Sequence, residues 1–371
     1  MSSVDLDAVG RLESRIQAEI DSGRSLAAQY ALGLHGRVVA GRSFGTATDA
    51  HRFVIFSATK TIVQFALVPE IASGALELTA PVAEYIPEFG ENGKDAVTVL
   101  QLLTMQGGFP LANIGPNHWG SSEGRRSRFA RWSLQYPAGT VTEYHPVSAH
   151  WVIAELIETL AGQPFEDVVH RRVTEPAGAA AILTRTTEAP VVEIRATGQR
   201  PTDADADGMA ALLAAYGGQP DRVPLAPIDA DAMVAMNDPV FQSACMPGGG
   251  GRARAADVAL VYQHVLADDS PWMRDALRTV RNASINVSDG VPALRTIAGV
   301  VAGADGLHRY RWFPNAPRAF GHHGAGGQLC WCDPDTGLSF TFLHDTHHRD
   351  PSVTLLRNED LNSLALECVQ P

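Results

Sequence analysis

Lysine is scarce in this 371-residue chain, which holds only Lys60 and Lys94 beside 27 arginines. Acidic residues outnumber basic ones by 41 to 29, so the formal net charge is −12. A negative surface repels phosphate backbones and anionic lipids. The composition therefore argues against non-specific nucleic-acid binding and against a polybasic membrane contact.

The chain also lacks long apolar runs: no stretch reaches the ~18 uncharged residues of a membrane helix. Residues 1–7 have neither the basic region nor the apolar core of a signal peptide. Only four cysteines occur, Cys245, Cys330, Cys332 and Cys368, too few for a disulfide framework in a chain of this length. These absences predict a cytoplasmic protein with reduced thiols and no membrane partner.

Hydrophobic periodicity predicts both helices and strands. The two ends of the chain carry helix and strand patterns, while the middle is mainly helical. Within the middle, an irregular, arginine-rich stretch at 110–140 either walls a pocket or is a solvated surface. This arrangement predicts an α+β fold. The predicted helices cover 4–21, 147–161 (amphipathic) and 359–369, and a further helix opens at Ser57 and ends near Pro69. The predicted strands cover 27–34, 38–44, 320–332 and 338–344.

Ser57 and Lys60 form the motif around which the chain is organised. Residues three apart share one face of a helix, so the lysine amine is expected near the serine hydroxyl. A serine attacks carbonyl groups only when a base takes its proton, and a lysine becomes such a base when burial lowers its pKa. The alternative is an N-cap serine beside a solvated lysine.

Three further segments follow in order along the chain. They are Leu-Leu-Thr-Met-Gln-Gly-Gly at 102–108, Pro-Ala-Gly at 137–139 followed by Tyr144, and Gly-His-His-Gly-Ala-Gly-Gly at 321–327. Together with Ser57-Ala58-Thr59-Lys60, this ordered set resembles the serine β-lactamase and penicillin-binding-protein superfamily. The similarity is greatest to its class C branch and to the related family VIII carboxylesterase-like enzymes.

The resemblance implies a β-lactamase-like fold, in which an antiparallel sheet is flanked by N- and C-terminal helices. Residues 1–75 and 286–371 would form the α/β lobe, residues 76–285 an inserted, mostly helical lobe, and the active site would lie between them. No metal or cofactor is implied.

The resemblance also implies residue roles. Ser57 would form an acyl-enzyme, and Lys60 and Tyr144 would act together as the base. The backbone amides of Ser57 and Ala325 would form the oxyanion hole, with Gly324 allowing the substrate close approach.

Two departures from the family pattern bear on the substrate. His322 stands where β-lactamases carry a lysine that meets the substrate carboxylate, and it is expected to be a weaker, pH-dependent cation. Tyr144-His145-Pro146 stands where many relatives have Tyr-x-Asn. Both departures favour esters or small amides without an obligatory carboxylate over β-lactams.

Structural alternatives accompany these roles. Tyr144 could be a loop tyrosine that packs its ring, and His322 and His323 could be ordinary residues at a strand end.

Two other motifs lack essential residues: the acidic loop at 203–208 has no twelfth-position glutamate for Ca²⁺, and the glycines at 248–251 are not followed by Lys-Ser/Thr. The cluster His344, Asp345, His347 and His348 falls at a strand end, without the helical spacing of a zinc motif.

The prediction is therefore a serine hydrolase that acts through an acyl-enzyme on small carboxylic esters. The alternatives are a D-amino-acid amidase, peptidase or acyltransferase with the same residues, and, from another class, a ligand sensor that acylates without turnover. The natural substrate and the oligomeric state are not determined by the sequence.

Overall fold

The computed structural model describes residues 3–186, 188–200, 229–305 and 314–370. Its centre is a six-stranded antiparallel sheet with the order β3-β2-β12-β11-β10-β9. The predicted α+β class and antiparallel sheet are confirmed. The strands are β2 (Ala27–Leu34), β3 (Arg37–Gly45), β9 (Val300–Val301), β10 (Phe320–Gly321), β11 (Leu329–Asp333) and β12 (Leu338–His344).

The hairpin of β2 and β3 forms where the sequence predicts it. Its two turn residues, His35 and Gly36, have φ values of 54° and 78°, the left-handed pair that a tight two-residue hairpin requires. Along β2 the side chains alternate between the two faces of the sheet: Tyr30 and Leu32 join one hydrophobic cluster, and Ala27 and Ala31 join the other.

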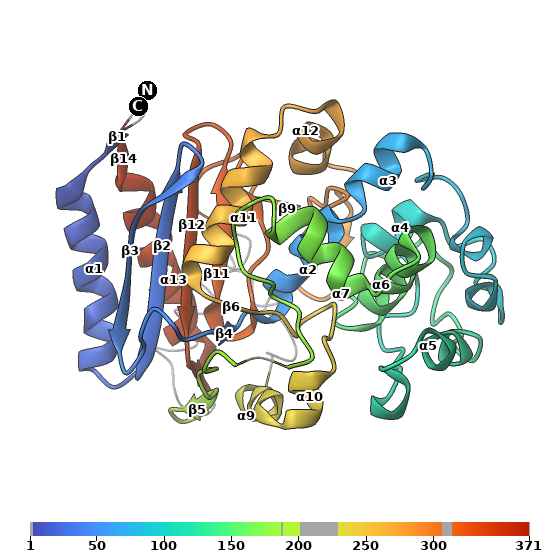
Figure 1. The fold of residues 1–371 in the computed structure, drawn as a ribbon, viewed down its shortest axis with the longest axis horizontal. Helices are drawn as coiled ribbons and strands as arrows, with labels where there is room; N and C mark the ends of the chain where they lie inside the picture. The colour runs from blue at the N-terminus through green and yellow to red at the C-terminus, as the bar shows by residue number, and fades with distance from the viewer. Residues whose placement is uncertain (1–2, 187, 201–228, 306–313, 371) are drawn as a thin grey trace.

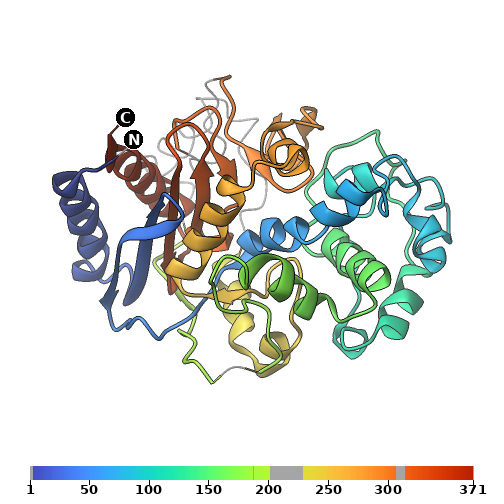
Figure 2. The ribbon, with the colours of Figure 1, turned by 45° about the horizontal axis from the view of Figure 1, so that its top comes forward.

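Helices cover both faces of this sheet. The terminal helices α1 (Leu6–Asp21) and α13 (Pro351–Glu367) pack against each other on one face, and α11 (Ala255–Ala267) packs on the other (Figures 1 and 2). α13 starts earlier than its predicted range of 359–369, because Asp350 caps it and Pro351 occupies its first turn. The termini lie together, since β1 (Ser3–Val4) pairs with β14 (Val369–Gln370).

The placement of α11 differs from the predicted division of the chain. It lies within 76–285, the range predicted for the inserted lobe, yet it packs on β2 and β12. Its buried alanines and valines form an apolar surface that the sheet covers. The remaining boundaries of the two lobes stay a prediction.

A second group of helices lies beyond α11, away from α1 (Figure 2). Its central member, α6 (Ser148–Ala161), packs among several other helices. The predicted helix and its end at Gly162, with a φ of 66°, are confirmed. The predicted amphipathic character is wrong, because every residue from Ser148 to Ile157 is buried. The neighbours are α2 (Thr59–Phe65), α4 (Val99–Leu103), α5 (Ser122–Phe129) and α7 (Phe165–Val169).

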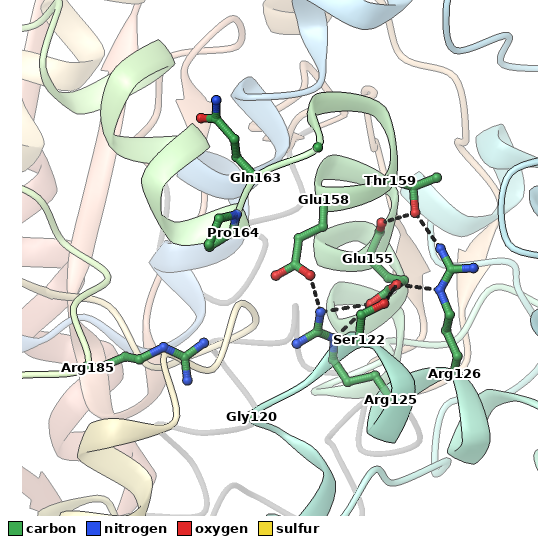
Figure 3. Close-up of a pocket in the computed structure, with 11 residues that line it drawn as sticks. Gly120, Ser122, Arg125, Arg126, Glu155, Glu158, Thr159, Gln163, Pro164 and Arg185 are labelled. Carbon is green, nitrogen blue, oxygen red and sulfur yellow. Dashed lines mark hydrogen bonds and ion pairs between the residues drawn. The ribbon is translucent and has the colours of Figure 1, made fainter.

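The arginine-rich stretch is partly helical rather than irregular. Arg125 on α5 is only 1% exposed and forms ion pairs with Glu155 at 2.9 Å and with Glu158. Arg126 pairs with Glu155 at 2.6 Å. The stretch does line a cavity of about 360 Å³, shown in Figure 3, but the lining includes none of the predicted catalytic residues. Its charged side chains hold α5 against α6.

Among the described residues, no helix combines the length and apolar character needed to cross a bilayer. The acidic loop at 203–208 lies outside the described residues. Six other short strands occur among the described residues. β4 (Phe53–Val54) pairs with β6 (Arg252–Ala253), β5 (Arg195–Thr197) runs parallel to β13 (Thr346–His348), and β7 (Ile285–Asn286) pairs with β8 (Val291–Pro292).

Candidate active site

Ser57 lies in a tight 3-10 turn, Phe56–Ala58, directly before α2. The α-helix therefore begins two residues later than predicted, but the turn keeps Ser57 and Lys60 on one side. Phe56 has a φ of 45°, a left-handed value that is costly for a bulky residue. Its ring packs edge-on against His347 with centroids 4.9 Å apart, so tertiary packing supports the strained turn that presents the serine.

Lys60 is fully buried, with 0% of its surface exposed, which excludes the solvated lysine of the alternative reading. Its Nζ lies 3.1 Å from Ser57 Oγ, 2.7 Å from the carbonyl oxygen of Pro146 and 2.5 Å from that of Gly248. Burial lowers the pKa of this amine, and Tyr144 opposes that effect. In this arrangement Nζ donates to Ser57 Oγ as well as to the two carbonyl oxygens. Once the amine loses a proton, its lone pair can accept the hydroxyl proton of Ser57.

Tyr144 approaches the same oxygen from another part of the chain. Its hydroxyl donates to Ser57 Oγ at 2.7 Å. Two cationic side chains lie over its ring: Lys60 Nζ is 5.1 Å and Arg295 Cζ 5.5 Å from the centroid. The structure thus brings together the three residues predicted to be catalytic. A serine with a buried amine and a phenol in hydrogen-bond range can exchange its proton with either group.

The glycine-rich segment predicted to continue one strand forms a turn instead. β10 ends at Gly321 and β11 begins at Leu329, because Gly326 and Gly327 have φ values of 73° and 106°, outside the range of a strand. Within this turn, the left-handed Gly326 interrupts any helix at Ala325–Gly327, and the Gly327 amide donates to the Gly324 carbonyl oxygen at 3.2 Å.

The turn lies against the segment that leads into Ser57. Ala325 packs with Val54 and Phe56, and a Cβ on Gly324 would approach the carbonyl oxygen of Ile55 to 2.3 Å. Gly324 is therefore required for this close contact. The two backbone segments predicted to form an oxyanion hole lie side by side.

Two histidines rejected as metal ligands support this turn. Nε2 of His344 lies 3.0 Å from the Gly326 carbonyl oxygen, and Arg357 donates to the same oxygen at 3.1 Å. The ring of His347 lies between Phe56 and Gly326. A Cβ added to Gly326 would lie 2.4 Å from that ring. No three metal-binding side chains converge among the described residues. This bracing role was not predicted, since the histidine-rich strand end was its one signal in the sequence.

His322 differs from its predicted character. It is 3% exposed, and burial, His323 and nearby cations hold its pKa well below the ordinary value. Its Nδ1 lies 2.8 Å from the His323 carbonyl oxygen. A carbonyl oxygen only accepts hydrogen bonds, so Nδ1 carries the proton and Nε2 presents a lone pair. The ring lies 5.9 Å from that of Tyr144, where it serves as a neutral acceptor rather than a cation.

Two contributions were not found from the sequence. Arg295 reaches the ring of Tyr144 from the segment between β8 (Val291–Pro292) and β9. The glycine run at 248–251 is not a phosphate loop; it passes close to α2, where Gly248 accepts from Lys60 and Gly251 donates to Thr59 Oγ1 at 3.0 Å.

Comparisons with known proteins find a matching family and several similar proteins and structures. The family model described as Beta-lactamase matches residues 12–363. The esterase/beta-lactamase LipL of Mycobacterium tuberculosis (strain ATCC 25618 / H37Rv) is 24% identical over 335 residues, covering 79% of this chain and 68% of LipL. A family VIII carboxylesterase structure superposes with a TM-score of 0.77 at 20% identity, over 99% of this chain and all of that one. The D-amino acid amidase of Ochrobactrum anthropi SV3 gives 0.68 at 15% identity, with 98% of each chain covered.

Proposed function

Because the chain belongs to the Beta-lactamase family, we propose that it is a serine hydrolase that cleaves small carboxylic esters through an acyl-enzyme. The observation that carries the proposal is the convergence on Ser57 Oγ of the buried Lys60 amine at 3.1 Å and the Tyr144 hydroxyl at 2.7 Å. The esterase named among the sequence relatives supports the same activity.

In the first step, Ser57 Oγ bonds to the ester carbonyl carbon and gives its proton to the Lys60–Tyr144 pair. The carbonyl electrons move onto oxygen, where the amides of Ser57 and Ala325 would stabilise the negative charge. Collapse of this intermediate breaks the bond to the alcohol, which leaves with the proton held by the pair. Water then repeats the sequence on the acyl-enzyme and releases the acid.

The test compares hydrolysis of short-chain p-nitrophenyl esters by the wild type and by Ser57→Ala, Lys60→Ala and Tyr144→Phe. We expect kcat to fall by about 10²–10⁴-fold in the two base variants and further in Ser57→Ala. Arg37→Ala is a control, since it removes an exposed cation at the β2–β3 hairpin. Ester turnover that survives Ser57→Ala would mean that another residue is the nucleophile.

The alternatives use the same three residues and differ in the acceptor or the acyl group. D-amino-acid amides in the same assay distinguish an amidase, and added alcohols distinguish an acyltransferase. A burst of one product per protein without later turnover would instead indicate a ligand sensor.

A further inference from the structure

Arg357 is a buried cation that lies against the glycine turn at 324–327. It belongs to α13 and is 3% exposed, and its Nη2 donates to the Gly326 carbonyl oxygen at 3.1 Å. Asn358 Oδ1 accepts from its Nε at 3.3 Å, and its Cζ lies 5.4 Å from the centroid of the Phe342 ring. The guanidinium is therefore held in place with one N–H directed at the turn.

No carboxylate in the described part of the chain forms an ion pair with this guanidinium. Glu19 and Asp345 act on it only through longer-range electrostatics, and Glu19 is paired with Arg15 at 2.5 Å and with Arg24 at 3.1 Å. Burial lowers the pKa of Arg357 to about 10, so the side chain stays protonated at neutral pH. A buried charge without a paired carboxylate acts strongly on negative charge that forms nearby, because the protein interior screens it weakly.

His344 is the second side-chain donor to the same carbonyl, and it carries no charge. Its Nδ1 accepts from the Thr346 amide at 3.2 Å, so the ring proton lies on Nε2, which is 3.0 Å from the Gly326 oxygen. Burial and the charge of Arg357 hold the pKa of His344 well below its ordinary value. Of the two side chains on this carbonyl, Arg357 is therefore the charged one.

Two peptide groups connect the Gly326 carbonyl to the predicted oxyanion donor. The Gly326 carbonyl shares a peptide group with the Gly327 N–H, which donates to the Gly324 carbonyl oxygen at 3.2 Å. The Gly324 carbonyl shares the next peptide group with the Ala325 N–H. The turn is closed by the Gly327 N–H and by the Gly324 N–H, which donates to the Gln328 oxygen at 2.8 Å, so neither bond uses the Ala325 N–H. A cationic donor at the Gly326 carbonyl polarises both peptide groups in the direction that makes the Ala325 N–H a stronger donor.

We propose that Arg357 is a positioning residue of the oxyanion hole, whose charge strengthens the Ala325 N–H through these two peptide groups. The inference rests on the proposed function and deepens it. When Ser57 Oγ bonds to the ester carbonyl carbon, the carbonyl oxygen becomes negative, and the polarised N–H binds this oxygen more tightly than it binds the neutral ester. The charge of Arg357 should therefore raise kcat and leave KM nearly unchanged.

Two substitutions remove the effect of the charge in different ways. Arg357→Met replaces the guanidinium by an apolar side chain. Asn358→Asp is isosteric and places a carboxylate beside Nε, while Arg357 keeps its bond to Gly326. Both should lower kcat on p-nitrophenyl butyrate by about 5- to 50-fold, less than the loss of a whole oxyanion donor, with little change in KM.

Two further variants complete the kinetic comparison. Arg357→Lys keeps the charge and should retain more activity than Arg357→Met. Arg37→Met removes an exposed arginine at the β2–β3 hairpin and should keep the wild-type kcat.

An NMR measurement separates the effect of the charge from mechanical support of the turn. Ser57 Oγ bonds to the carbonyl carbon of a trifluoromethyl ketone and gives its proton to the Lys60–Tyr144 pair, which forms a hemiketal whose oxygen lies in the oxyanion hole. With ¹³C at that carbon, the chemical shift reports the ionisation of the hemiketal as the pH is varied. The hemiketal pKa should be higher by about 1 in Arg357→Met and in Asn358→Asp than in the wild type, which corresponds to a tenfold weaker stabilisation of the oxyanion.

Asn358→Asp decides the question even if Arg357→Met folds poorly, because it leaves Arg357 in place. An unchanged hemiketal pKa in Asn358→Asp would overturn the inference, and any loss of activity in Arg357→Met would then reflect packing. In that case a wild type that forms the hemiketal and hydrolyses esters leaves the proposed function intact. A wild type that does neither would refute the proposed function and this inference with it.

Discussion

The substitution Gly326→Ala tests how the tertiary structure supports the active site. Gly326 has a φ of 73°, and a Cβ placed on it would lie 2.4 Å from the ring of His347. The left-handed conformation costs an alanine about 1–2 kcal/mol. The clash must also be relieved, either by displacing His347 from Phe56 or by moving the turn that holds Ala325. Each movement alters one of the two backbone segments proposed to bind the oxyanion.

The expected result is a loss of transition-state stabilisation rather than of substrate binding. Removal of one oxyanion donor typically costs about 10²–10³-fold in kcat, so Gly326→Ala should lose up to that factor on p-nitrophenyl butyrate with a smaller change in KM. His347→Ala in the same chain removes the clashing ring, and the double variant should recover part of the loss. This non-additive recovery is the signature of a steric cause.

Gly10→Ala is a matched control, because a Cβ at this position in α1 meets no atom within 4 Å. It should keep the wild-type kcat and gain up to about 1 kcal/mol of stability from the better helix former. A folded Gly326→Ala with wild-type kcat would refute the reasoning. So would a double variant that is no more active than Gly326→Ala.

Two predictions concern stability. Burial lowers the pKa of His145 and that of His347 to about 4. At a pH below their ordinary pKa of about 6.5, these two side chains therefore bind more protons in the unfolded chain than in the folded one. The free energy of unfolding should therefore decrease between pH 6.5 and 4, by about 1.4 kcal/mol per pH unit for each buried histidine. Urea titrations at several pH values test this, and equal midpoints at pH 7 and 5 would contradict it. Glu155→Ala should cost about 3–5 kcal/mol, because it leaves Arg125 buried with fewer partners. Glu367→Ala breaks an exposed pair with Arg11 and should cost less than about 1 kcal/mol; similar midpoints for the two variants would disprove the difference.

Local signals in the sequence predicted much of the fold. The hairpin turn at 35–36 and the helix end at Gly162 depend on residues that tolerate a left-handed conformation, a property of the residue itself. The helix that leads from Ser57 stops before Pro69, as predicted: α2 ends at Phe65, and Pro69 lies in the first turn of α3 (Val68–Ser73). Such features need no knowledge of distant contacts.

Predictions failed where distant segments determine the environment. The pattern of α6 suggested an exposed face, but neighbouring helices cover it. The interruption of the predicted strand at 320–332 depends on support from His344, His347 and Arg357 for the glycine turn, which no local pattern reveals.

The sequence by itself determined which chemical groups are available: one serine with a lysine three residues later, a tyrosine after a Pro-Ala-Gly segment, and a glycine-rich segment, in the order of a known family. The tertiary structure decided what these groups can do. It buried Lys60 between two carbonyls, made His322 a neutral acceptor, and placed Arg295 over the ring of Tyr144. The physical reason is that pKa, charge pairing and proximity depend on the atoms around a side chain, and folding brings most of those atoms from distant parts of the chain.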